Sequence, residues 1–166
     1  MTYRGGVRPE RWGRDGDCFA VTVDRVVNLA EFVSAFYGSP VFRIERLILR
    51  VLLGAPSSDS DARAVAGGSG ESFAVWYVGE RTATQLLMCD RYERTRSWFR
   101  VVPLSGGRTL LQFGSAVAAL GDRTRSGSRG GFRLLLRFHV LYSQALLHAA
   151  RLGVMKAPAA GAARER

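Results

Sequence analysis

Residues 72–120, SFAVWYVGERTATQLLMCDRYERTRSWFRVVPLSGGRTLLQFGSAVAAL, decide the fold. They contain four strand-length runs rich in β-branched, aromatic and aliphatic side chains: 72–79, 84–91, 96–104 and 109–120. The connections between the runs are short, and Ser105-Gly106-Gly107 is the clearest turn. Short connections favour an antiparallel meander over parallel crossovers.

A strand and a helix are predicted at the beginning of the chain. Residues 17–23 alternate between apolar and polar side chains, which adds a strand and brings the predicted total to about five. Asn28 is a typical N-cap, and Glu31 stands three residues later, where it completes a capping box. The helix that follows is expected to end at Gly38.

A second helix is predicted to begin at Ser39 and Pro40, a cap residue followed by a proline at the first helical position. Its buried face is predicted to carry Val41, Ile44, Ile48, Val51 and Leu52. Its opposite face is predicted to carry Arg43, Arg46 and Arg50. Residues 54–71 and 121–130 are rich in glycine and serine and are predicted to be loops. A long apolar helix is predicted over residues 131–153.

These elements predict one α+β domain over residues 17–153, with a disordered arm at 1–16 and a disordered tail at 154–166. The most apolar stretches, 41–53 and 132–152, are interrupted by arginines, so no membrane-spanning segment is predicted. No secretory signal is evident and only two cysteines occur, so a cytoplasmic location is expected. No glycine-rich phosphate loop, nucleophile elbow or metal-ligand spacing is found, so no cofactor or metal is predicted.

The formal net charge of +10 has two interpretations. Arginine supplies 23 of the 24 basic residues, which is typical of a composition biased by a GC-rich genome. The charge is also uneven, because ten arginines and only two acids lie between Arg91 and Arg137. A basic surface there could bind nucleic acid or an anionic membrane surface.

His139 and Tyr142 are the best candidates for a reactive site. They lie one turn apart on the predicted apolar face of the long helix, so both are expected to point inward. A histidine in such a place can exchange protons near neutral pH, and the tyrosine can orient it. The alternative is that His139 hydrogen-bonds a neighbour and simply completes the core.

Three residues of the predicted sheet are candidates for lining a ligand site. Trp76 and Trp98 belong to an aromatic set that suits either a pocket wall or an ordinary core. Arg100 shares a face with Trp98 by strand alternation. If that face is inward, Arg100 can anchor a carboxylate or phosphate, and otherwise it is a surface arginine.

The order of elements, and several short motifs, resemble a known superfamily. The motifs are Phe73-Ala-Val-Trp-Tyr-Val-Gly-Glu-Arg, Leu86-Leu-Met-Cys-Asp-Arg, Ser97-Trp98-Phe99 and His139-x-x-Tyr142-Ser143. Over residues 17–152 the chain resembles the START and birch-pollen-allergen-like (SRPBCC) superfamily of helix-grip domains, and most closely an uncharacterised bacterial family within it. Typical members have five or six strands after the paired helices, whereas four are predicted here. The resemblance implies an antiparallel sheet wrapped around the C-terminal helix, with a cavity for an apolar or aromatic ligand between them.

The predicted function is therefore binding of a small apolar or amphipathic molecule, with Trp76, Trp98, Arg100, His139 and Tyr142 lining or anchoring the site. One alternative is a cyclase- or hydratase-like enzyme that uses His139 and Tyr142 as an acid–base pair. Another is an arginine-rich interaction module for anionic partners.

Overall fold

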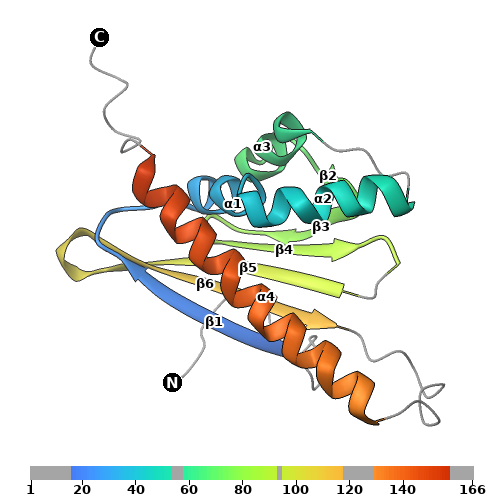
Figure 1. The fold of residues 1–166 in the computed structure, drawn as a ribbon. Helices are drawn as coiled ribbons and strands as arrows, with labels where there is room; N and C mark the ends of the chain where they lie inside the picture. Colours follow the sequence, from blue (N-terminus) through green and yellow to red (C-terminus); the bar gives the residue numbers. More distant parts are fainter. Residues whose placement is uncertain (1–15, 54–57, 93–94, 118–128, 158–166) are drawn as a thin grey trace.

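A computed structural model describes residues 16–53, 58–92, 95–117 and 129–157, apart from the side chains of residues 16, 45, 48–53, 117 and 129–140. Its strands are β1 (Gly16–Val23), β2 (Ser72–Phe73), β3 (Trp76–Arg81), β4 (Gln85–Asp90), β5 (Thr95–Leu104) and β6 (Arg108–Val117). Its helices are α1 (Leu29–Tyr37), α2 (Pro40–Leu53), α3 (Asp59–Gly67) and α4 (Arg129–Lys156). Figure 1 shows the helices gathered on one side of the sheet. The predicted α+β class is confirmed.

The strands form one open antiparallel sheet in the order β1-β6-β5-β4-β3-β2. The predicted meander is confirmed, but the described residues form six strands where about five were predicted. The additional strand arises because residues 72–79 do not form one strand. Ala74 adopts a left-handed conformation with φ of 54°, so the chain turns and β2 pairs back onto β3.

The first helix packs its aromatic side chains onto the centre of the sheet. The ring centroid of Phe36 lies 4.8 Å from that of Phe99 on β5 and 4.6 Å from that of Phe113 on β6. Phe32 makes a further edge contact with Phe99 at 5.7 Å. The predicted capping box of Asn28 and Glu31 is present and sets the start of α1. These contacts place α1 directly on β5 and β6.

The second helix begins as predicted, since the amide of Phe42 donates to the Ser39 hydroxyl at 3.2 Å. Its two faces were predicted correctly only in part. Val41 packs against the core and the Arg43 side chain is 60% exposed, as predicted, and the side chains of Ile48, Val51 and Leu52 lie outside the described residues. Ile44, expected to be buried, is 63% exposed, whereas the Arg46 side chain is only 12% exposed. The Arg46 guanidinium donates to Asp59 and lies 5.5 Å from the ring centroid of Phe73. Arginine can occupy such an inward position because its stem is apolar and its charge is paired.

Part of the predicted loop 54–71 forms α3. Ser58 and Asp61 make a reciprocal capping box at its start, and Gly68 ends it in the left-handed conformation with φ of 86°. Only small side chains face the core, namely Ala62, Val65 and Ala66. The helix was missed because glycine, serine and alanine dominate this stretch and no large apolar side chain repeats at helical spacing.

The C-terminal helix runs to Lys156, beyond the predicted end at Gly153 and into the stretch 154–166 that was expected to be disordered. Gly153 serves close packing instead of helix termination, because a Cβ atom there would lie 3.1 Å from the Cβ of Ala35 on α1. Arg25 caps the observed end by donating to the carbonyls of Val154 and Ala157. The predicted arm 1–16 lies outside the described residues except for Gly16. No helix in the described part of the chain is long and apolar enough to cross a membrane.

We predict that Phe36→Ala lowers the free energy of unfolding by about 3–5 kcal/mol, because it leaves a cavity between α1 and the sheet. Urea denaturation followed by circular dichroism measures the change. Leu141→Ala, at a side chain that is 65% exposed, is the matched control and is expected to change stability by less than about 0.5 kcal/mol. Equal effects of the two substitutions would contradict the packing described for α1.

Candidate functional site

On the face of the sheet that packs against the helices, a row of aromatic side chains lies next to a row of polar side chains. The strand register places one aromatic row across three strands: Phe19, Phe113 and Phe99. Two residues further along the same strands lies a polar row: Asp17, Ser115 and Ser97. We name this second row the polar corner. Residues two apart on a strand share a face, so both rows face the helices.

Different helices lie over the two rows. The phenylalanines of α1 cover the aromatic row, whereas α4 contacts β1 and β6, which carry Asp17 and Ser115. Figure 1 shows α2 and α4 diverging toward the end of the sheet where β1 begins and β6 ends. The polar corner lies at that end. The rings of α1 contact the aromatic row, and the polar corner lies next to that row, with Ser115 only 6% exposed.

Tyr142 is the predicted site residue with a described side chain on α4, the helix that contacts β1 and β6. It is half-buried and packs against the edge of the core cluster. His139 lies one helical turn before it on α4, but the His139 side chain is outside the described residues. The expected pairing of the two side chains therefore stays a prediction.

Trp76 also faces the helices, but at the other side of the sheet. It is half-buried, packs against the core cluster and pairs across strands with Asp90. Its indole N–H is buried, and no described residue accepts a hydrogen bond from it. A buried donor without a partner costs about 1–3 kcal/mol, so an acceptor supplied from outside the protein would be stabilising there.

Trp98 and Arg100 lie on the opposite face of the sheet. Their neighbour Phe99 belongs to the core cluster, and side chains alternate along a strand. Trp98 is nevertheless only 6% exposed, and its indole N–H donates to Gln85 Oε1 at 3.1 Å. Arg100 donates to Gln112 at 3.5 Å. The structure therefore does not bring these two residues together with Tyr142, and they cannot line a cavity beneath α4.

Asp90 has a structural role that the sequence did not reveal. The turn between β4 and β5 is rich in charged residues, but the Asp90 side chain is buried. Its carboxylate accepts from the amide of Tyr92 at 2.6 Å, the amide of Thr95 at 2.9 Å and the Thr95 hydroxyl at 2.8 Å. These bonds fix the turn, as an aspartate often does at such positions.

Part of the basic stretch shares the face of Trp98. Arg96, Arg100 and Arg108 lie on this face, since each pairs in register with residues of the same face. The other arginines between residues 91 and 137, apart from the exposed Arg91, lie outside the described side chains. The described portion thus places three positive charges on the side of the sheet away from the helices.

Comparison with known proteins adds no family assignment. No family model matches the chain, and no curated protein matches it. Among the described residues, no group of three or more histidine, cysteine, aspartate or glutamate side chains is arranged to hold a metal ion.

We predict that Trp98 and Gln85 act as one structural pair. Trp98→Phe leaves a buried amide oxygen without its donor and should cost about 1–3 kcal/mol of unfolding free energy. Gln85→Met removes the other partner, and the double variant should cost less than the sum of the two single changes. Urea denaturation of all four proteins measures the coupling. Additive losses would show that the hydrogen bond contributes nothing.

Proposed function

We propose that this protein is a helix-grip domain that binds a small amphipathic molecule between the sheet and α4. The observation that carries the proposal is the step from the aromatic row to the polar corner, which lies beyond the ring contacts of α1. Ligand sites are commonly apolar surfaces with a few convergent polar groups. The resemblance of the element order and motifs to ligand-binding helix-grip domains supports the same function.

The polar corner indicates which end group the ligand carries. Asp17 supplies a carboxylate that accepts hydrogen bonds, and Ser97 and Ser115 supply hydroxyls that accept or donate them. A carboxylate on the ligand would be repelled by Asp17, whereas a hydroxyl or amino group can donate to it. The site therefore favours a molecule with an apolar body and a hydrogen-bond-donating end.

The position of Trp76 determines how long a ligand must be to reach it from the polar corner. β3 lies four strands from β1 in the sheet. Neighbouring strands are about 4.8 Å apart, so Trp76 is roughly 19 Å from the strand that carries Asp17. A small ligand at the polar corner lies beside Phe19, and only a long one also reaches the indole N–H of Trp76.

Exposed apolar side chains on the two diverging helices are consistent with an apolar ligand. On α2, Ile44 and Leu47 are 63% and 61% exposed, and Leu141 on α4 is also exposed. Several large apolar side chains in water on helices that border one site are a common mark of binding surfaces. They give an apolar molecule a favourable approach to the polar corner.

We predict that 1-aminoanthracene, an uncharged aromatic amine, binds with a rise in fluorescence. Ser97→Phe fills the polar corner and should weaken binding by about tenfold, since overpacking costs about 1–3 kcal/mol and tenfold in affinity corresponds to about 1.4 kcal/mol. Ser105→Phe, in the exposed β5–β6 turn, is the control and should bind like the unchanged protein. Equal binding by all three proteins would place the probe elsewhere.

We also predict that 1-decanol displaces the probe at least about fivefold more effectively than decanoate, because Asp17 repels the carboxylate. Asp17→Asn removes that charge and should reduce the difference between 1-decanol and decanoate in displacing the probe. Competition titrations at low and high salt measure how effectively each molecule displaces the probe. A preference for decanoate that disappears with added salt would instead assign binding to the basic surface.

A further inference from the structure

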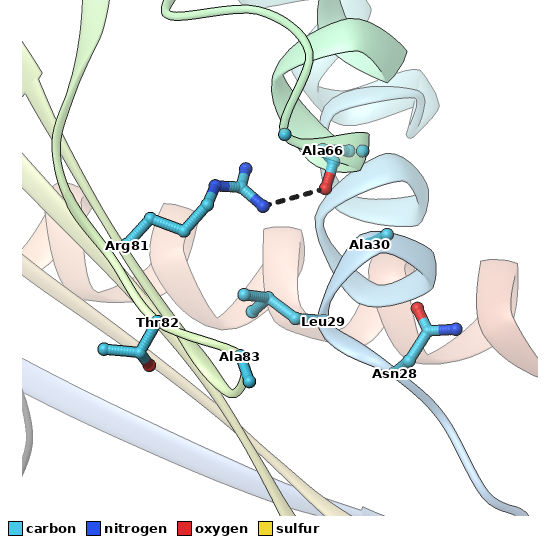
Figure 2. A pocket seen from close by; sticks show the side chains of 9 residues that line it. Asn28, Leu29, Ala30, Ala66, Arg81, Thr82 and Ala83 are labelled. Atoms are coloured by element: carbon cyan, nitrogen blue, oxygen red, sulfur yellow. Dashed lines mark hydrogen bonds between the residues drawn. The ribbon is translucent and has the colours of Figure 1, made fainter.

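A groove lies away from the polar corner, between α1, α3 and the β3–β4 turn. It is lined by residues 28–30 at the start of α1, 66–68 at the end of α3 and 81–83 at the turn, and its volume is about 570 Å³. Figure 2 shows Arg81 reaching from the strand toward the end of α3, with Leu29 pointing into the same space from α1. Arg81 brings a formal positive charge to this groove.

The Arg81 guanidinium is held in place by the end of α3. One terminal nitrogen donates to the Ala66 carbonyl at 3.2 Å, and the other donates to the Val65 carbonyl. The guanidinium also packs beside Gly68, where a Cβ atom would lie 3.5 Å from Nη1. A guanidinium carries five N–H donors, so three remain after these two bonds.

Arg81 differs in its charge balance from Arg25 and Arg46, two other partly buried arginines that donate to neighbouring elements. Arg25 also donates to the end of a helix, but it pairs in addition with Glu31 at 2.6 Å. Arg46 pairs with Asp59. Among the described residues no carboxylate lies within salt-bridge distance of Arg81, and burial lowers the pKa of its guanidinium. The α3 carbonyls that accept from Arg81 supply only partial negative charge, so its full positive charge has no ionic partner among the described residues.

The first turn of α1 adds positive potential to the same groove. The Asn28 side chain caps the amide of Glu31, and the amides of Leu29 and Ala30 are positions that a helix leaves without intrahelical partners. The partial positive charge of the helix start therefore faces the same space as Arg81. The nearby Glu31 carboxylate does not cancel it, because Arg25 and the Asn28 amide already bind that group.

We propose that this groove binds a small oxyanion, a carboxylate or a phosphate, as the counter-ion of Arg81. The anion accepts from the remaining guanidinium N–H groups and from the first-turn amides of α1. The groove is built from α3 and the β3–β4 turn, which take no part in the polar corner. Its occupancy does not depend on the amphipathic ligand proposed above.

The test is a titration of the ¹⁵N-labelled protein with sodium phosphate and, separately, sodium acetate, at constant ionic strength kept with sodium chloride. The Nε–H signal of Arg81 should shift and saturate, while that of the exposed Arg108 should not. Saturation by phosphate alone assigns a phosphate, saturation by acetate alone assigns a carboxylate, and both support the oxyanion class. A response at Arg81 no larger than at Arg108 overturns the proposal.

Two variants distinguish the contribution of the Arg81 charge to anion binding from its contribution to folding. Arg81→Gln should weaken anion binding by at least about tenfold, because it removes the charge-assisted donors. It also weakens the cap of α3, so backbone amide signals of α1 report the binding, and circular dichroism checks the fold. Arg81→Lys keeps the charge and should bind within about tenfold of the unchanged protein. A folded Arg81→Gln variant with unchanged affinity would overturn the role of Arg81.

Discussion

The position of Phe36 between Phe99 and Phe113 is the contact on which the rest of this structure depends. It places α1 directly on the sheet, so the middle of the covered face is filled with aromatic rings. The long helix α4 then packs against α1 and β1, with Gly153 allowing a close approach to Ala35. Because the centre is occupied, space for a ligand is to be sought at the end of the sheet, where the polar corner lies. The candidate site therefore lies at the end of the sheet and not at the centre of the core.

The arginines of this chain illustrate how a compositional bias becomes structural. A biased composition explains their number but not their positions. Arg25 donates to the last carbonyls of α4, and Arg81 donates to the last carbonyls of α3, which are the negative ends of the two helices. Arg46 binds Asp59 at the start of α3. The short, alanine-rich α3 is thereby held at both ends by arginines from other elements, and one of these arginines lacks a carboxylate of its own within the described chain.

Local signals in the sequence predicted local structure well. The capping box of Asn28, the Ser39 and Pro40 start of α2 and the Ser105-Gly106-Gly107 turn each depend on neighbouring residues, and each is observed. The direction in which side chains face was harder to predict from the sequence. Alternation placed Trp98 and Arg100 on one face but could not say which face, and the apolar stripe of α2 concealed that Arg46 points inward. These outcomes depend on distant partners such as Asp59 and Phe36. The same limit applied to the site. Trp98 and Arg100 lie on the face away from the helices, whereas Trp76 and Tyr142 pack against the core cluster on the other face.

Native mass spectrometry of the freshly purified protein and of its Ser97→Phe variant tests the central claim most directly. We expect that the unchanged protein carries an additional mass that denaturation removes, and that this mass belongs to an apolar molecule with a hydroxyl or amino end. The variant, whose polar corner is filled, should appear without it. An unchanged protein that shows only its bare mass, under conditions gentle enough to preserve complexes, would contradict the account. A variant that retains the same bound molecule would contradict it as well.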